Sequence, residues 1–559
     1  MNQLSGAEAF VRMLQKHGVT HVFGLCGDTS LPLYDALYRL DHGITHVLTR
    51  DERSAAYMAD AYARVSGRVG VCEGPSGGGA TYLLPGVAEA NESSVPLLAI
   101  TTDIATTSRG RFTLTELDQQ ALFRPVTKWN RALDKASAIP ATLRTAFTQM
   151  TTGRPGAVHL GLPYDVQKDP VEEGDVWADP TLERCPSRRT APDLAAVQEA
   201  AARLKAAARP VFICGGGVVI SGAEAELQQL AERLGGPIAT TISGKGSIAE
   251  DHPLAAGVVG SNGGTPETRA VVEAADLVVF VGCRAGSVTT ERWRHPASGT
   301  PIIHIDVDPA VIGANYRTEI GLVGDARLCL AALNGELAGV ERAAWGAAPV
   351  ERAKKEKFEA FLALARSDTT PIRPERIVHD LEAVLPADAI AIADPGTPCP
   401  YLSAYWRLNR TGRHFISNRA HGALGYSLPA AVGASFGRPG AKCIAVMGDG
   451  AFGFSVGELE TLVRLKLPVM LIVVSNSGYG WIKAGQRTGY GGRYFSVDFD
   501  RSDHAAIAQA YGLKAWRVQE PQALRRVLAD AIAVDGPTLV DVIAQPLHEA
   551  RAPVSEWVA

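Results

Sequence analysis

The stretch 443–476 constrains the fold of this chain more than any other. It contains two apolar runs, 443–446 and 469–474, and the first leads into the turn Gly448-Asp449-Gly450. Between the runs, apolar residues recur at helical spacing over 459–463, which is typical of one buried helical face. A strand, a helix and a strand in this order predict a βαβ unit, whose two strands become parallel neighbours.

Two polar residues follow the two predicted strands. Because the carboxyl ends of neighbouring parallel strands lie side by side, we expect Asp449 and Asn476 to meet. A carboxylate and an amide oxygen suit Mg²⁺ or Ca²⁺, and such ions commonly keep sites for phosphate oxygens. The glycines would let backbone N–H groups approach a diphosphate at the start of the helix. The pattern indicates a metal and diphosphate site; an ordinary turn with a capping aspartate is the alternative at this point.

Composition excludes several classes of protein. Hydrophobic residues make up 46% of the 559 residues and charged residues 20%, which is an ordinary globular balance. A net charge of −4 gives no reason to expect binding to nucleic acid or to an anionic membrane. The apolar runs are too short to span a bilayer. The N-terminal segment predicts an amphipathic helix rather than a signal peptide, so we expect a cytoplasmic protein.

Cysteine spacing adds no chemistry. The eight cysteines form no CxxC motif, and several lie in apolar runs, so we expect buried thiols in a reducing compartment.

Strands and helices alternate along the whole chain, which predicts α/β domains with doubly wound parallel sheets. We expect three such domains, covering residues 1–165, 190–340 and 375–559. The Pro-rich, charged stretch 165–193 is typical of a surface linker. A charged helix over 350–373 is expected to precede the third domain.

The turn at Asp449 followed by Asn476 resembles the metal-binding motif of thiamin-diphosphate (ThDP) enzymes. The resemblance implies that Asp449, Asn476 and the backbone carbonyl of Gly478 bind Mg²⁺. Further segments look like the acetolactate synthase, pyruvate oxidase and 2-oxo acid decarboxylase superfamily in the right order, among them HGVTHVFGLCGD, GPSGGGATYLLPGVAEA, RPVTKW, GALGYSLPAAVGA and GPTLVDV. The three domains then correspond to a pyrimidine-binding domain, a middle domain and a diphosphate-binding domain.

The resemblance assigns a catalytic role to Glu52. A carboxyl group that is hydrogen-bonded to N1′ of the aminopyrimidine favours the imino form of that ring. The 4′ nitrogen of the imino form then removes the proton from thiazolium C2. Outside this family, Glu52 would be an ordinary acidic residue in a first helical turn. In such enzymes the glutamate of one subunit reaches the cofactor held by another, so the resemblance implies a homodimer or a homotetramer.

Further cofactor contacts follow by position in the family motifs. Thr397 replaces a Gln of the synthases, and its hydroxyl can still bond a phosphate. Leu424 takes the place of the bulky apolar residue that props ThDP in its bent form. The full set of expected cofactor contacts is Gly396, Thr397, Gly422, Leu424, Gly448, Gly450 and Ala451.

Several positions bear on the reaction. Asp28 matches an acidic residue of pyruvate decarboxylases, but Ile482 stands where those enzymes place a catalytic glutamate. Gly485 replaces the acceptor-side Trp of acetolactate synthase, and Leu114-Thr115 replaces its Phe-Gln pair. We therefore expect decarboxylation of a 2-oxo acid, pyruvate or a relative, and ligation of the acyl unit to a carbonyl acceptor. The expected substrate-side residues are Gly27, Asp28, His421, Ile482 and Gly485.

The sequence leaves alternatives open for the middle domain, for His421 and for the function. Gly215-Gly216-Gly217 and His304-Ile305-Asp306 resemble the flavin-binding version of the middle domain, while the altered segment around Arg284 favours a scaffold without FAD. His421 could donate a proton or support a neighbouring group. A non-oxidative 2-oxo acid decarboxylase is the alternative enzyme. A ThDP-fold protein that binds without turnover is the non-enzymatic alternative.

Overall fold

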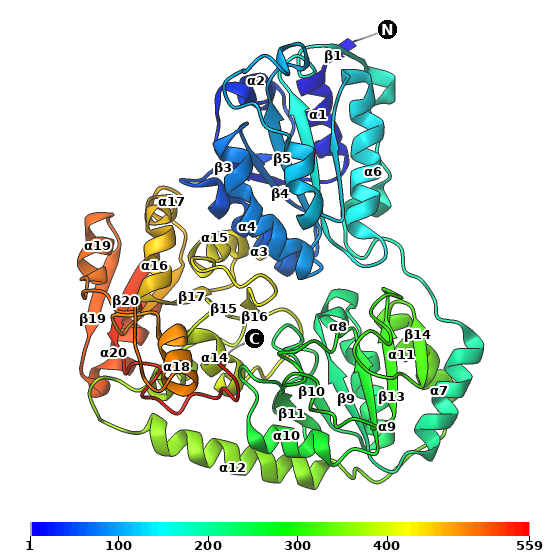
Figure 1. Ribbon diagram of the computed structural model, residues 1–559, viewed down its shortest axis with the longest axis vertical. Coiled ribbons are helices and arrows are strands. Elements are labelled where there is room, and N and C mark those ends of the chain that lie inside the picture. Colours follow the sequence, from blue (N-terminus) through cyan, green and yellow to red (C-terminus); the bar gives the residue numbers. More distant parts are fainter. Residues whose placement is uncertain (1–2, 558–559) are drawn as a thin grey trace. The chain divides into compact units, whose positions relative to one another are not determined.

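The computed structural model describes residues 3–557 (Figure 1). The chain divides into two compact units. The first unit runs to Arg188 and also includes Asn418–Gly440 and Ser455–Leu467. The second unit contains Arg189–Ser417, Ala441–Phe454 and the chain from Pro468 onward. Two segments from late in the sequence therefore pack with the N-terminal part of the chain.

The first unit contains a six-stranded parallel sheet in the order β3-β2-β4-β5-β7-β6. Its strands are β2 (His21–Gly24), β3 (Thr45–Leu48), β4 (Gly70–Gly74), β5 (Leu97–Asp103), β6 (Trp129–Ala132) and β7 (Ala157–Pro163). The strand order reverses between β2 and β4, because β3 lies on the other side of β2. Ligands of doubly wound folds bind at such a switch point, beyond the carboxyl ends of the strands.

Helices of the first unit pack around this sheet. They are α1 (Gly6–Lys16), α2 (Leu31–Arg39), α3 (Glu52–Ser66), α4 (Gly78–Glu92), α5 (Gln119–Phe123), α6 (Ile139–Thr151), α15 (Ser427–Gly437) and α17 (Leu459–Arg464). The amphipathic face expected for the N-terminal helix is present: Ala9, Phe10 and Met13 are fully buried. A capping box at Ser5 and Glu8 begins α1.

The predicted linker 165–193 is only partly a linker. β8 (Pro170–Glu172) pairs antiparallel with β1 (Gln3–Ser5), and both Val171 and Leu182 are buried. Burial of these two apolar side chains anchors most of the stretch to the first unit, which runs to Arg188.

Two further six-stranded parallel sheets form the second unit. The first has the order β11-β10-β9-β12-β13-β14. Its strands are β9 (Pro210–Cys214), β10 (Ile238–Thr240), β11 (Ala255–Val258), β12 (Leu277–Val281), β13 (Ile302–Asp306) and β14 (Ile320–Val323). Its helices are α7 (Leu194–Ala206), α8 (Gly216–Ser221), α9 (Glu224–Leu234), α10 (Pro266–Glu273) and α11 (Ala326–Glu336).

The charged helix α12 (Ala347–Ala365) ends earlier than the predicted 350–373, because Arg366 caps it and the residue before Pro371 disfavours helix.

The third sheet has the order β16-β15-β17-β18-β20-β19. Its strands are β15 (Ile390–Ala393), β16 (Phe415–Ser417), β17 (Cys443–Gly448), β18 (Met470–Ser475), β19 (Lys514–Val518) and β20 (Thr538–Ile543). Its helices are α13 (Pro374–Glu382), α14 (Pro398–Tyr405), α16 (Asp449–Ser455), α18 (Gly480–Gly489), α19 (His504–Ala510) and α20 (Pro521–Ile532). The three doubly wound parallel sheets expected from the sequence are thus confirmed.

One detail of the βαβ prediction is wrong. The connection between β17 and β18 holds two helices, α16 and α17, joined by the 3₁₀ turn η7 (Val456–Glu458). α16 already begins at Asp449. Gly453 and Gly457 lower the helix propensity of the segment, which explains why one continuous helix does not form.

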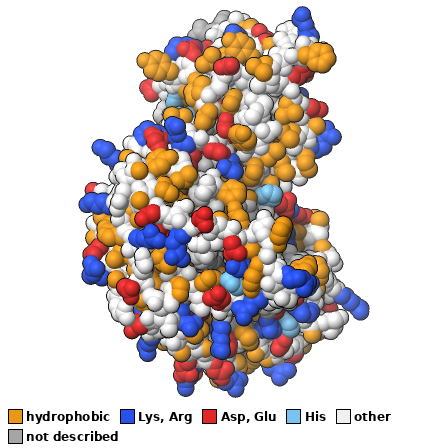
Figure 2. All heavy atoms as spheres, turned by 60° about the vertical axis from the view of Figure 1, so that its left-hand side comes forward, with side chains coloured by type: hydrophobic (Ala, Val, Ile, Leu, Met, Phe, Trp, Pro, Cys, Tyr) orange, Lys and Arg blue, Asp and Glu red, His pale blue; other side chains and the backbone are white. Residues whose placement is uncertain are grey.

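Surface composition matches the sequence. Figure 2 shows basic and acidic side chains interspersed on the face drawn. Among residues 3–557, no helix is long and apolar enough to cross a membrane. Six cysteines are buried and two, Cys26 and Cys185, are half-buried, all as free thiols.

Candidate active site

Glu52 begins α3 in the first unit and is 7% exposed. Two glycines leave room for its carboxyl group. A Cβ added at Gly79 would lie 3.0 Å from Glu52 Oε1, and one at Gly74 would lie 3.3 Å from Glu52 Cγ. Burial raises the pKa of Glu52. The carboxyl is therefore kept partly desolvated and more basic than usual.

The turn that presents Glu52 is held at two points. Asp51 caps α3 by accepting a hydrogen bond from Arg53 N. The backbone N–H of Arg50 donates to Glu458 Oε1 at 2.9 Å. Glu458 is 1% exposed and also accepts from Thr461. A carboxylate from the second inserted segment thus fixes the approach to the predicted catalytic residue.

Close helix packing holds the rest of α3. A Cβ added at Gly433 of α15 would lie 1.9 Å from Met58 O, so only glycine allows the two helices to approach this closely. Beside this contact, Arg64 pairs with Asp60 at 2.8 Å and with Glu89 at 3.0 Å, and all three are buried. Paired and desolvated charges of this kind resist separation, because removing one partner leaves a buried charge uncompensated.

The same ion-pair cluster holds the segment that contains His421. The backbone N–H of His421 donates to Glu89 Oε2 at 2.7 Å, while its side chain is exposed. Gly422 has a φ of +77°, and a Cβ added there would meet open space. Leu424 is half-buried.

Gly27 and Asp28 follow β2 at the switch point of the first sheet. A Cβ added at Gly27 would lie 2.4 Å from Pro75, which follows β4. Asp28 opens the 3₁₀ turn η1 (Asp28–Ser30), and its side chain is exposed. Both residues therefore lie where ligands of doubly wound folds bind.

In the second unit, Asp449 and Asn476 lie side by side, as parallel strands require. Asp449 Oδ2 accepts from Asn476 N at 2.8 Å and from Ser477 N at 2.6 Å, and Asp449 Oδ1 accepts from Gly450 N at 2.9 Å. Asp449 is 6% exposed, and burial raises its pKa. The backbone bonds orient the carboxylate toward the ends of β17 and β18.

Glycines around this pair leave open space. Cβ atoms added at Gly396 and Gly448 would meet nothing within 4 Å, and Gly396 has a φ of +98°. Thr397 is buried beside Gly480, with its hydroxyl 3.6 Å from where a Cβ would stand. Gly450 packs against the Tyr479 ring, and Ala451 is buried in α16.

Three expected residues lie on or before α18. Gly478 packs against Val497 O. Ile482 is 54% exposed. At Gly485 a Cβ would stand 3.9 Å from Trp557, whose ring lies 5.0 Å from that of Trp481. The C-terminal segment therefore lies directly beside Gly485.

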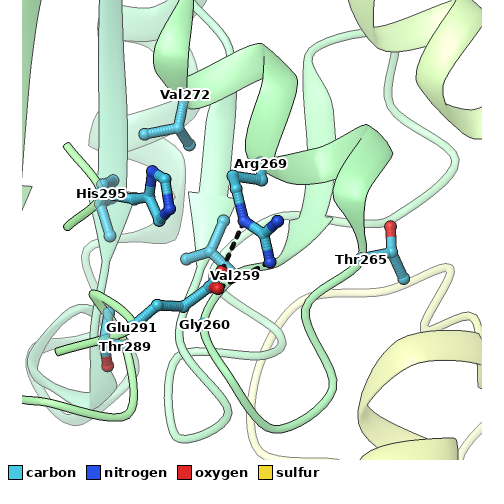
Figure 3. A pocket seen from close by; sticks show the side chains of 9 residues that line it. Val259, Gly260, Thr265, Arg269, Val272, Thr289, Glu291 and His295 are labelled. Atoms are coloured by element: carbon cyan, nitrogen blue, oxygen red, sulfur yellow. Dashed lines mark hydrogen bonds and ion pairs between the residues drawn. The ribbon is translucent and has the colours of Figure 1, made fainter. Parts of the chain in front are cut away.

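The middle sheet has its switch point between β9 and β12, where Gly215 and Gly282 lie. Gly215 N donates to Val281 O at 2.9 Å, and Gly217 N donates to Gly282 O at 3.1 Å. These amide groups are thus already satisfied by carbonyl oxygens. A small pocket nearby contains a bidentate pair in which Arg269 contacts Glu291 at 2.7 and 2.6 Å (Figure 3). The charges of Arg269 and Glu291 in this pocket therefore neutralise each other.

Sequence reasoning missed two buried carboxyl groups of the first unit, Glu73 and Glu458. Both stand in segments that the resemblance covers, but neither falls on a family motif. Glu73 interrupts the apolar strand β4 (GVCEG), and an acidic residue at a buried strand position is the signal that could have revealed it.

Three doubly wound sheets with these glycine-lined strand ends define an α/β enzyme architecture. Three family descriptions match the chain: "Thiamine pyrophosphate enzyme, N-terminal TPP binding domain" over residues 4–122, "central domain" over 197–333 and "C-terminal TPP binding domain" over 394–542.

Relatives match along nearly the whole chain. A "Probable acetolactate synthase large subunit" of Methanocaldococcus jannaschii is 37% identical over 97% of this chain and 92% of its own length. The "Acetolactate synthase isozyme 3 large subunit" of Escherichia coli K12 is 32% identical over 95% of this chain and 93% of its own. The chain belongs to the thiamine pyrophosphate enzyme family, in its acetolactate synthase-like group. The expected class of enzyme and its ThDP cofactor are thereby confirmed.

Proposed function

We propose that the protein decarboxylates a 2-oxo acid, pyruvate or a relative, and ligates the acyl unit to a second carbonyl compound. The observation that carries the proposal is the buried Glu52 carboxyl in a chain that resembles acetolactate synthases over its full length. ThDP, when bound, supplies the nucleophilic carbon and the electron sink for loss of CO₂.

The chain's own residues prepare this chemistry. Glu52 would hydrogen-bond the aminopyrimidine, and its raised pKa favours the protonated carboxyl that can donate to a ring nitrogen. The backbone at Gly396 and Gly448 and the Thr397 hydroxyl would donate hydrogen bonds to the diphosphate, which is supported by the open space at both glycines. By the family resemblance, Leu424 and the backbone at Gly422 in the first unit would support the cofactor, and the backbone at Gly450 and Ala451 in the second unit would contact its diphosphate.

Mg²⁺ is the proposed metal. Its protein ligands are Asp449, the side-chain oxygen of Asn476 and the carbonyl of Gly478, all hard oxygen donors. Among the described residues, no group of three His, Cys, Asp or Glu side chains could hold a metal ion. A metal at the strand ends therefore needs amide and carbonyl ligands, together with oxygens of the diphosphate.

We expect the middle domain to work without FAD. The amide groups of Gly215 and Gly217 already donate to protein carbonyls, so they do not offer the phosphate cradle of a dinucleotide site. The visible absorbance spectrum of the purified protein tests this directly. A flavin spectrum that survives gel filtration would contradict it.

The proposed substrates are small molecules, and the substrate-side residues expected from the family resemblance are Gly27, Asp28 and His421 in the first unit and Ile482 and Gly485 in the second. Ile482 cannot donate a proton, which favours carboligation over simple protonation. Asp28 is exposed at the switch point and is the residue that a decarboxylase would use.

The assembly and the location complete the proposal. We expect a homodimer or homotetramer, because Glu52 acts on a cofactor held by another subunit in the family arrangement. We also expect the domain boundaries 1–165, 190–340 and 375–559 and a cytoplasmic location, which eight free thiols favour.

The test is a product survey. The purified protein is incubated with ThDP, Mg²⁺ and a panel of 2-oxo acids, alone and paired with aldehyde or 2-oxo acid acceptors, and the products are identified by mass spectrometry. Hydroxyketone or hydroxy-oxo acid products establish carboligation. If aldehyde is the sole product, the protein is a non-oxidative 2-oxo acid decarboxylase. If no CO₂ is released while ThDP is bound, both enzymatic assignments are contradicted. The remaining alternative is then a ThDP-fold protein that binds without turnover.

A further inference from the structure

Glu73 is a carboxyl group that the proposed chemistry does not use. It is the second-last residue of β4, at the switch point of the first sheet, and is 1% exposed. Gly24 of β2 stands directly beside it in register, and a Cβ there would lie 2.6 Å from Glu73 Oε2. The strand pair thus provides a place for this side chain at the ligand-binding edge of the sheet.

Hydroxyl groups surround the buried carboxyl. Ser30 Oγ donates to Glu73 Oε1 at 2.7 Å, and the Tyr34 hydroxyl donates to Glu73 Oε2 at 2.7 Å. The Tyr34 hydroxyl also lies 2.9 Å from His46 Nε2. In the described part of the chain, the hydrogen bonds to Glu73 come from these neutral donors. A carboxylate without a cationic partner is costly to bury, so the protonated form gains relative to the charged form.

A continuous row of hydroxyl groups leads from Glu73 to the surface. It begins with Ser30 and ends with Thr115, whose residue is exposed. The oxygen–oxygen distances are 3.0 Å for Ser30–Thr102, 2.8 Å for Thr102–Thr29, 3.2 Å for Thr29–Ser76 and 2.7 Å for Ser76–Thr115. The five residues come from η1, β5 and the loops after β4 and β5, so the row exists only in the folded unit.

We propose that this hydroxyl row is a proton relay through which the buried Glu73 exchanges its proton with solvent, and that Glu73 thereby controls the charge beside Glu52. Each hydroxyl can donate one proton and accept another. In the structure the Thr29 hydroxyl donates to Ser76 Oγ, so for inward transfer it first rotates to accept from Ser76. One proton then enters at Thr115, each hydroxyl passes its own proton to the next oxygen, and one proton arrives on Glu73. No other bond changes, and Glu73 acts as a positioning residue.

The histidine, tyrosine and cysteine side chains around Glu73 stay neutral near pH 7. Burial lowers the pKa of His46 to about 4, so His46 is neutral near pH 7. Burial raises the pKa values of Tyr34, Cys26 and Cys72, so these also stay neutral. Burial, with a smaller contribution from the charge of Glu52, raises the pKa of Glu73 itself to about 7. Within this cluster Glu73 is thus the group whose charge changes near neutral pH.

The relay is tested on the protein without cofactor, by infrared spectroscopy at about pH 6, where a carboxyl of pKa about 7 is mostly protonated. The carbonyl stretch that disappears in Glu73→Gln belongs to Glu73. After rapid dilution into D₂O, this band shifts as the proton is replaced. In Thr102→Val we expect the shift to be about tenfold slower or more, because exchange then requires local opening of the unit.

Thr101→Val is the matched control. Thr101 is the adjacent residue of β5 and is equally buried, but its hydroxyl bonds His159 outside the row. Its exchange should equal that of the wild type. Thr29→Val breaks a different link and serves if Thr102→Val does not fold. Wild-type exchange in a folded Thr102→Val or Thr29→Val protein overturns the relay, as does a spectrum without a band that depends on Glu73.

The coupling to Glu52 rests on the proposed function and has its own readout. The pH profile of CO₂ release should lose one ionisation near pH 7 in Glu73→Gln and keep it in Thr102→Val, because the relay changes the rate of proton exchange and not its equilibrium. An unchanged profile in Glu73→Gln overturns the coupling. The infrared result is independent of turnover, so failure of the relay and failure of the proposed enzyme are distinguishable.

Discussion

The backbone N–H of Asn476 donates a hydrogen bond of 2.8 Å to Asp449 Oδ2 across 27 positions of the sequence. The bond fixes the register of β17 against β18 at their carboxyl ends. It also leaves the Asn476 side chain available as a second oxygen donor beside the carboxylate. The two residues that we propose as metal ligands are thus held side by side by a backbone hydrogen bond.

Asp449→Asn should weaken the metal site without unfolding the protein. The amide oxygen can still accept from the backbone of Asn476 and Ser477, but it lacks the charge that attracts Mg²⁺. We expect the Mg²⁺ concentration needed for half-maximal ThDP binding to rise about tenfold or more, measured by calorimetric titration. Asp388→Asn, at an exposed aspartate of the same unit, is the control. Equal Mg²⁺ dependence in all three proteins would exclude Asp449 as a ligand.

Glu52→Gln should abolish most of the activity while the fold is kept. The amide has the same shape but cannot exchange a proton with the cofactor, and loss of such a group costs about 10²- to 10⁴-fold in rate. The measurement is CO₂ release at saturating ThDP, with circular dichroism as the check of folding. Asp51→Asn keeps the helix cap and removes a neighbouring charge. If both variants lose activity equally, the effect belongs to the turn and not to Glu52.

The stability of the first unit should depend on the ionisation of Glu73. Its pKa is raised from 4.5 to about 7, so the folded protein binds the proton more tightly than the unfolded chain. The stabilisation is complete below 4.5 and is lost as the pH rises through about 7, with a loss of about 3 kcal/mol. Glu73→Gln should therefore gain stability relative to the wild type between pH 5 and pH 8.

Urea unfolding at the two pH values measures this difference. Glu199→Gln, at an exposed glutamate, should follow the wild type at both. A Glu73→Gln protein whose difference from the wild type does not change with pH would mean that Glu73 is ionised throughout this range.

Gly485→Trp should change the choice of acceptor. A side chain at this position meets Trp557, which packs on Trp481, so an indole must displace the C-terminal segment. We expect the ratio of kcat/KM values for a large and a small acceptor to change about tenfold. Gly485→Ala, whose Cβ fits at 3.9 Å, should keep the wild-type ratio. Unchanged preference in Gly485→Trp would place the acceptor elsewhere.

Gly433→Ala should destabilise the first unit strongly. The added methyl group would stand 1.9 Å from Met58 O, and α15 cannot move away without separating from the buried pairs of α3. We expect a loss of about 3 kcal/mol, measured by thermal unfolding. Gly335→Ala in α11, where nothing lies within 4 Å, should instead be neutral or gain up to about 1 kcal/mol. Similar melting temperatures for Gly433→Ala and the wild type would contradict the close contact.

Much of the architecture could be predicted from local patterns. Apolar runs indicate buried parallel strands, and the predicted runs 443–446 and 469–474 match β17 and β18 to within two residues. The adjacency of Asp449 and Asn476 also follows from the order of elements in the sequence. The two strands of a βαβ unit usually become parallel neighbours, so their carboxyl ends lie side by side. Glu52 was identifiable only through its resemblance to a family segment.

The amino-acid sequence by itself thus determined the three sheets, the family and the polar residues at the ends of neighbouring strands, because these depend on periodicity and short connections. Tertiary structure alone decided how Glu458 holds the turn before Glu52, how Trp557 borders Gly485 and how five hydroxyls connect Glu73 to the surface. Those contacts join residues from distant segments, and their formation depends on side-chain packing in three dimensions, which leaves no periodic signal in the chain.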